Sequence, residues 1–275
     1  MKFLSARRRH PLAGVVVLVL GLLVIGGLYS TLRPAAADDS KSDQKLISQG
    51  RHLFVVSCSS CHGMNAEGIK TKRGDNYGPP LIGVGAAAVD FQVGTGRMPL
   101  AVPGTQAQER EPVFTEKETA ALAAYIASLG PGPAIPSKEQ YNPSSLSEEQ
   151  IAEGGSLFRT NCTACHNFAA QGGALPHGRY APPLGGVEAK HMYEAMLTGP
   201  QQMPVFSDDV LTPQDKRQMI AYIKQVTTQP GYGGAKIGSL GPISEGLWLW
   251  TGGIGVLVLI AAWIGNNGVR ARKRQ

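Results

Sequence analysis

A chain of 275 residues is long enough for about two small domains, each with its own hydrophobic core. Its formal net charge of +6 comes from its two ends, because the first ten residues carry four cations and the last six carry four more, with no acid among them. The span 33–245 holds the other 18 cations against all 20 acids, and this near balance excludes the broad basic surface that nucleic-acid binding needs.

An uncharged apolar stretch at 11–32 follows the N-terminal cations. It is long enough for a helix that crosses a bilayer, and Lys and Arg concentrate on the cytoplasmic side of such helices. A basic segment, an apolar run and the small residues Ala35-Ala36-Ala37 also describe a cleavable signal peptide. The length of the run favours a retained anchor within residues 1–37, and both alternatives place the following residues outside the cytoplasm.

The middle of the chain contains an internal repeat. The segment 53–62, LFVVSCSSCH, returns 104 residues later as 157–166, LFRTNCTACH. Three further pairs follow in the same order: Gly78-Pro79-Pro80-Leu81 with Ala181-Pro182-Pro183-Leu184, Arg97-Met98-Pro99 with Gln202-Met203-Pro204, and Tyr125-Ile126 with Tyr222-Ile223. Four matched landmarks in one order predict a duplicated domain.

The apolar spacing predicts a mainly α fold, with helices at 44–58 and 115–129 in the first repeat and at 147–162 and 212–226 in the second. Thr115 with Glu118 is typical of a capping box, and Thr212-Pro213 is typical of a helix start. Glycine and proline are dense between each histidine and the later methionine, which indicates loops there.

These elements predict two tandem domains at 44–130 and 147–228. The segment 131–146, rich in proline, glycine and serine, is expected to link them.

A glycine-rich stretch at 231–246 leads to an uncharged apolar run at 246–269, which predicts a C-terminal transmembrane helix. All three tryptophans flank this run, where interfacial anchors are expected; they are Trp248, Trp250 and Trp263. The basic tail 270–275 is then cytoplasmic. We therefore expect a multi-pass protein of the cell membrane, with both termini inside and the two domains outside.

All four cysteines lie in two Cys-x-x-Cys-His segments, Cys58 to His62 and Cys162 to His166. This pattern is typical of c-type haem attachment, in which two thiols form thioethers with the haem and the histidine is the proximal iron ligand. Two disulfides are one alternative, but closing such short loops adds little stability. A shared zinc site is another, and it leaves the repeated histidine and methionine positions unexplained. The sequence predicts two covalently bound haems c.

A methionine followed by proline stands at a repeated distance from each histidine: Met98 is 36 residues after His62, and Met203 is 37 after His166. Methionine opposite histidine is the ligation of cytochromes c and raises the reduction potential. The predicted haem-binding residues are therefore Cys58, Cys61, His62, Met98, Cys162, Cys165, His166 and Met203, and the iron ligands among them are His62, Met98, His166 and Met203. The methionines without a repeated match are predicted to pack in the core; they are Met64, Met192, Met196 and Met219.

Other histidines could compete for the iron, namely His52, His177 and His191. None has a counterpart in the other repeat, so surface or packing roles are expected for them. We further hypothesise that the loops at Pro79 and Pro182 place a backbone carbonyl against the second ring nitrogen of the proximal histidine.

The Cys-x-x-Cys-His, Pro-Pro-Leu and Met-Pro elements of both halves resemble class I cytochrome c domains, over about residues 44 to 228. With the C-terminal anchor, the whole layout resembles the di-haem cytochrome c subunit of the actinobacterial cytochrome bc complex, a menaquinol:cytochrome c reductase. The resemblance implies one-electron relay from a Rieske iron-sulfur protein to a terminal cytochrome oxidase, beside a cytochrome b subunit.

No acid-base pair suggests a catalytic residue of the chain's own, so enzyme activity is expected only through the reductase. A di-haem subunit of another terminal oxidase, a membrane-anchored di-haem peroxidase and a structural metal-binding module stay as alternatives.

Overall fold

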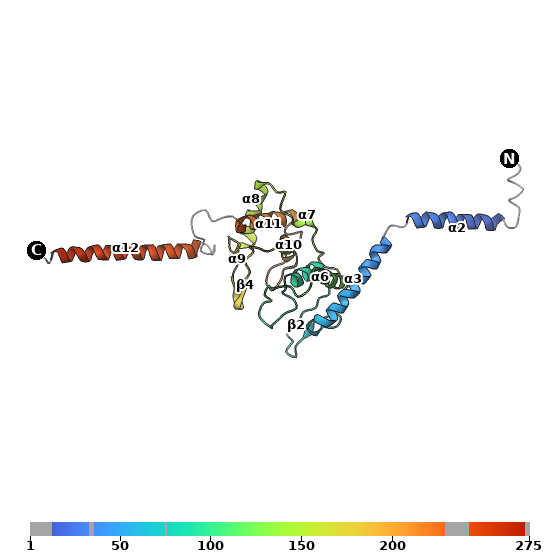
Figure 1. Cartoon of the computed structure of the whole chain (residues 1–275), viewed down its shortest axis with the longest axis horizontal. Helices are drawn as coiled ribbons and strands as arrows, with labels where there is room; N and C mark the ends of the chain where they lie inside the picture. The colour runs from blue at the N-terminus through green and yellow to red at the C-terminus, as the bar shows by residue number, and fades with distance from the viewer. Residues whose placement is uncertain (1–12, 33–35, 75, 229–241, 273–275) are drawn as a thin grey trace.

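The computed structural model describes residues 13–32, 36–74, 76–228 and 242–272, and their structure is mainly helical, as predicted (Figure 1). Strands in this part of the chain form two short antiparallel hairpins. One pairs β1 (Ile69–Lys70) with β2 (Asn76–Gly78), and the other pairs β3 (Gly173–Leu175) with β4 (Arg179–Ala181). The two hairpins occupy equivalent places in the two repeats, just after each Cys-x-x-Cys-His segment.

The first repeat consists of α3 (Ala36–Ser57), α4 (Ser59–His62), α5 (Gly85–Gly94) and α6 (Glu116–Ser128). Helix α6 packs against both α3 and α5. Its predicted capping box is confirmed, because the Thr115 hydroxyl accepts from the Glu118 amide while the Glu118 carboxylate accepts from the Thr115 amide. The core between these helices contains Phe54, Ala66, Val89, Val93, Leu122, Ala123, Tyr125 and Ile126.

The second repeat has the same order of elements: α8 (Glu148–Asn161), α9 (Thr163–His166), a short 3-10 turn η1 (Pro176–Gly178), α10 (Ala189–Thr198) and α11 (Pro213–Thr228). Helix α11 begins at Pro213, as predicted, and the Thr212 hydroxyl accepts from the Asp215 amide. Its core contains Phe158, Ala170, Met192, Tyr193, Met196, Leu211, Met219, Ile220 and Ile223.

A glycine allows the first and last helices of each repeat to cross at close range. A Cβ atom on Gly50 would lie 1.9 Å from the backbone oxygen of Ala121, and one on Gly154 would lie 2.1 Å from that of Gln218. An aromatic pair follows the crossing one turn later, with ring centroids 5.3 Å apart for Phe54 and Tyr125 and 5.7 Å apart for Phe158 and Tyr222. Both crossings hold the Cys-x-x-Cys-His segment at the end of the first helix.

Helices α5 and α10 lie in regions that we predicted to be loops. Glycine and proline are concentrated at the start of each region; after them α10 contains mostly good helix formers, and α5 contains three consecutive alanines. Helix α5 therefore begins at Gly85, and α10 follows Glu188 and ends at Gly199 in the left-handed conformation. Helices α5 and α10 pack against each other, which joins the two repeats.

The predicted linker is folded onto both domains. Its start contacts the first domain, where the Ala87 amide donates to the Pro133 carbonyl at 3.1 Å. Its end contains α7 (Lys138–Tyr141), which packs against α10 and α11 of the second domain. The Arg217 guanidinium donates to the Asn142 carbonyl just beyond α7.

The two apolar runs form α2 (Ala13–Leu32) and α12 (Pro242–Arg272) (Figure 1). Within the described residues, one helix is long and apolar enough to cross a membrane, at Gly246–Asn266 with a mean hydropathy of 2.0, and none of it is buried. The apolar part of α2, Ala13–Gly27, is shorter. The predicted basic segment before residue 13, most of the glycine-rich stretch 231–246 and residues 273–275 lie outside the described part of the chain.

Candidate functional site

Each Cys-x-x-Cys-His segment is a first cysteine followed by one short helix, α4 or α9, directly after the long first helix of the repeat. Cys58 follows the last residue of α3, and the His62 amide donates back to the Cys58 carbonyl at 3.0 Å. The second segment repeats this turn, with 2.9 Å between the His166 amide and the Cys162 carbonyl. The first cysteine and the histidine therefore stand about one helical turn apart in both repeats.

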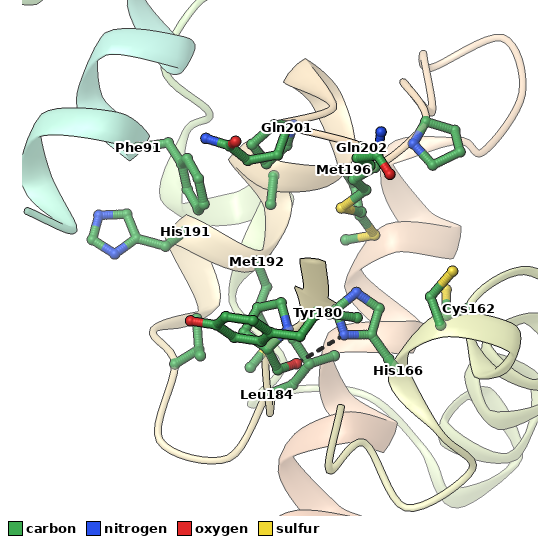
Figure 2. Close-up of a pocket in the computed structure, with 18 of the residues that line it drawn as sticks. Phe91, Cys162, His166, Tyr180, Leu184, His191, Met192, Met196, Gln201 and Gln202 are labelled. Carbon is green, nitrogen blue, oxygen red and sulfur yellow. Dashed lines mark hydrogen bonds between the residues drawn. The ribbon is translucent and has the colours of Figure 1, made fainter. Parts of the chain in front are cut away.

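The imidazole of each of these histidines is oriented by a proline carbonyl. His62 Nδ1 lies 2.8 Å from the Pro79 oxygen, and His166 Nδ1 lies 3.0 Å from the Pro182 oxygen (Figure 2). This confirms the hydrogen bonds that we hypothesised from the Pro-Pro-Leu elements. Because Nδ1 donates to the carbonyl, the Nε2 lone pair is left free to bind a metal. Burial also lowers the pKa of His166, which favours the neutral imidazole that a metal requires.

Backbone contacts hold the loop that lies beside each histidine. The Gly68 and Gly172 amides donate to the His62 and His166 carbonyls at 2.7 and 2.9 Å. A Cβ atom on Gly78 would lie 2.0 Å from the Cys61 carbonyl oxygen, so only glycine allows the Pro-Pro loop to approach the cysteine turn so closely. The sequence showed Gly78 as a repeat landmark, but the contact that requires it is visible only in the fold.

The four cysteines are free thiols in the structure. Burial, and secondarily the neighbouring cysteine, raises the pKa of both Cys58 and Cys162 to about 11. Reactive cysteines of dithiol redox motifs have lowered pKa values instead. These sites therefore do not have the electrostatics of a thioredoxin-like pair.

A cavity opens beside the cysteine turn of the second repeat (Figure 2). Cys162, Cys165, His166 and Met203 all line it, together with mainly apolar side chains such as Phe158 and Leu184. Two thiols, an imidazole with a free nitrogen and a thioether around an apolar cavity fit a haem group. In the first repeat, Cys58 and Met98 pack against one shared hydrophobic cluster, beside the buried His62.

The cavity is built from both repeats. Besides the second repeat's own residues, Phe91, Arg97, Gln106 and Glu109 of the first repeat line it. The Gln106 amide nitrogen donates to the Tyr180 carbonyl at 2.8 Å, and the Tyr180 amide donates to the Gln106 side-chain oxygen at 2.9 Å. This reciprocal contact fixes the first repeat against the wall of the second repeat's cavity.

Three methionines that we predicted to pack in the core are buried and also line this cavity; they are Met192, Met196 and Met219. The prediction was wrong for Met64, which is exposed. Their lack of a repeated match gave no signal that α10, which carries Met192 and Met196, would form one wall of the cavity.

The other histidines lie apart from the proximal positions. His52 and His177 are exposed. His191 is half-buried between the two repeats, with its ring edge-on to Phe91 at a centroid distance of 6.2 Å. In Figure 2 it lies across the cavity from His166.

Comparisons with known proteins agree with this geometry. The cytochrome c family model matches residues 47–130, and the model of subunit III of the cbb3-type cytochrome c oxidase matches residues 149–223. The cytochrome bc1 complex cytochrome c subunit of Corynebacterium efficiens is 44% identical, over 94% of this chain and 90% of its own length. The chain belongs to the family of cytochrome bc1 complex cytochrome c subunits. Its two cytochrome c domains indicate covalently bound haem c and a role in electron transfer.

Other members of the family align over nearly their full length. The subunit of Corynebacterium diphtheriae is 41% identical over 97% of this chain and 98% of its own, and that of Mycobacterium tuberculosis is 42% identical over 94% and 92%. In contrast, the cbb3-type oxidase subunit FixP of Sinorhizobium medicae is 30% identical over 31% of this chain. The predicted family is therefore confirmed, and membrane association follows from it together with the apolar C-terminal helix.

Proposed function

We propose that this subunit carries two haems c and relays single electrons from a Rieske iron-sulfur protein, through both haem domains, to a terminal cytochrome oxidase. Bound haem c supplies one-electron chemistry, because its iron cycles between the ferric and ferrous states. The chain's own residues hold the haems, set their potentials and bring the two domains together.

We propose the same ligand set in both domains. Cys58, Cys61, Cys162 and Cys165 would supply the thioether sulfurs. His62 and Met98 would bind the iron in the first domain, and His166 and Met203 would bind it in the second. The hydrogen bonds that His62 and His166 donate to the Pro79 and Pro182 carbonyls fix each imidazole and raise its basicity as a ligand. If a methionine and a histidine both bind each iron, no ligand position would stay open for peroxide, which favours an electron carrier over a peroxidase.

The observation that carries the relay is the shared cavity. Residues of the first domain form part of the wall around the second haem site, and α5 and α10 pack directly against each other. A haem held in this cavity would therefore lie beside side chains of the first domain, which suits electron passage within one chain.

The proposed arrangement in the membrane follows from the charges at the two ends. Residues 1–37 form an anchor or signal segment, 44–130 and 147–228 are the haem domains with 131–146 between them, 246–269 crosses the membrane, and 270–275 is cytoplasmic. The basic ends then lie inside and the haem domains outside, where they can contact the Rieske protein, cytochrome b and the oxidase.

Purification through an affinity tag on this chain in a mild detergent tests the function. A reduced-minus-oxidised absorption spectrum should show haem b and haem a beside haem c, in a preparation that oxidises menaquinol and reduces oxygen. Haem c together with oxidase haems but without haem b would instead support an electron-entry subunit of an oxidase. Haem c alone, in a preparation that keeps other membrane complexes intact, would contradict the proposed relay.

A further inference from the structure

The contact between the two haem domains contains a cluster of ionisable side chains that are not among the proposed haem ligands, although His191 also lines the cavity of the second domain. Asp90 comes from α5 of the first domain, and His191 and Glu194 come from α10 of the second. One ligand atom from each lies within 4.8 Å of the other two. His191 Nε2 is central, since it lies 3.9 Å from Asp90 Oδ2 and 4.0 Å from Glu194 Oε2.

Glu194 points into this cluster without a donor to satisfy it. Its side chain is 0% exposed, and neither carboxylate oxygen has a hydrogen-bond partner among the described residues. A buried carboxylate in this position needs a bound cation, which is either a proton or a metal ion. Burial, followed by the negative charge of Asp90, raises the pKa of Glu194 to about 9, so the proton holds the position when no metal is present.

The surrounding groups leave the imidazole available. The pKa of His191 is lowered, first by burial and then by the Lys190 ammonium, against smaller opposing effects of Glu188, Asp90 and Glu109. A neutral imidazole is the form that binds metal. The Lys190 nitrogen lies 2.7 Å from Asp90 Oδ2, but that side chain is 31% exposed and can turn toward solvent.

The backbone makes room for the imidazole at the end of α5. A Cβ atom on Gly94 would lie 3.3 Å from His191 Nε2, closer than most Cβ contacts. The absence of a side chain at Gly94 therefore keeps space beside the central nitrogen of the cluster.

We propose that Asp90, His191 and Glu194 bind a divalent transition-metal ion, of which Zn²⁺ is the best match, and that this ion ties the two haem domains together. One imidazole and two carboxylates with water in the fourth position suit Zn²⁺, which binds such ligands at about 2.0–2.2 Å. Ligand atoms on a tetrahedral ion at that distance are about 3.3 Å apart. The observed separations are 3.9 and 4.0 Å from His191 Nε2 and at most 4.8 Å between the two carboxylates, so side-chain rotations must shorten them for all three groups to bind one ion.

Binding exchanges a proton for the metal. The Glu194 carboxyl group releases its proton to solvent, its oxygen forms the bond to the metal, and no oxidation or reduction takes place. Because protons and the metal compete for Glu194, affinity should rise with pH.

The test uses the full chain with its haems attached, in which the cysteines are thioethers and do not bind zinc. The preparation is stripped with EDTA and equilibrated with micromolar free Zn²⁺. Zinc is measured by elemental analysis and haem c by the reduced absorption spectrum. We expect the wild-type chain to hold one more zinc ion than Glu194→Gln, and His191→Ala to bind at least about tenfold more weakly. His52→Ala, which removes an exposed histidine on α3, should bind like the wild type.

Equal zinc content in the wild type and Glu194→Gln would overturn the proposal and leave a shared proton as the occupant. Glutamine keeps the shape and the neutral charge of the protonated side chain, so this variant should fold. Asp90→Asn provides a second variant, with the haem spectrum as the check of folding. The outcome is independent of the proposed relay, because the haem spectra of the tagged complex test the relay and the zinc content tests the domain contact.

Discussion

Replacing Glu194 by glutamine should stabilise the subunit above about pH 5, in buffers that contain EDTA. Glu194 has a folded-state pKa of about 9 and an ordinary value of 4.5 in the unfolded chain. Between these values the unfolded chain releases a proton that the folded chain keeps, so the free energy of unfolding falls as pH rises. Below pH 4.5 both states hold the proton, and Glu194 no longer lowers the free energy of unfolding.

The stability that Glu194 costs the folded protein grows by about 1.4 kcal/mol for each pH unit above 4.5, which gives about 3 kcal/mol at pH 7. A glutamine side chain has no proton to lose, and its amide can donate to Asp90. At pH 7 the free energy of unfolding of the variant should therefore exceed that of the wild type by nearly this amount. At pH 4.5 the two proteins should be about equally stable. Urea unfolding of the full chain in detergent, followed by far-UV circular dichroism at several pH values, measures the stability difference between the two proteins at each pH.

The decisive result is the difference between the two proteins in how steeply the free energy of unfolding changes with pH. Equal slopes between pH 5 and 8 would refute the reasoning, because they would mean that Glu194 ionises alike in the folded and unfolded chains. Glu153→Gln is the matched control, since Glu153 is an exposed glutamate on α8. It should leave the slope unchanged.

Replacing Met98 or Met203 by leucine should lower the reduction potential of one haem each while the haem stays attached, as read by potentiometric titration; unchanged potentials in both variants would exclude these ligands. Gly154→Ala should destabilise the second domain by about 1–3 kcal/mol, because its Cβ atom would meet the Gln218 carbonyl at 2.1 Å. The exposed Gly104→Ala should change stability by less than about 0.5 kcal/mol in the same urea titrations. Phe158→Ala should lower the free energy of unfolding by about 3–5 kcal/mol, since this ring is 0% exposed. An unfolding midpoint like the wild type's would show that the neighbouring side chains fill the space left by the ring without loss of stability.

The sequence alone was enough to predict the family, the mainly helical fold and the repeated landmarks of the two domains. These features depend on short-range chemistry: thioether attachment needs two cysteines and a histidine at fixed spacing, and a transmembrane helix needs a long apolar run. The capping boxes at Thr115 and the helix start at Pro213 are equally local, and the structure has both. The duplication made single residues informative, because the second repeat gave each landmark an independent match.

The tertiary structure decided what lies between the repeats. His191 and Glu194 are three residues apart on α10, but Asp90 is about a hundred residues earlier in the chain, so the sequence could not bring it to His191 before α5 and α10 were seen to pack together. The two short helices were also hidden, since the density of glycine and proline before them outweighed their own composition. The sequence predicts the haem ligands of each domain from within one repeat, whereas the cavity wall and the contact between the domains depend on surfaces that only the packed chain brings together.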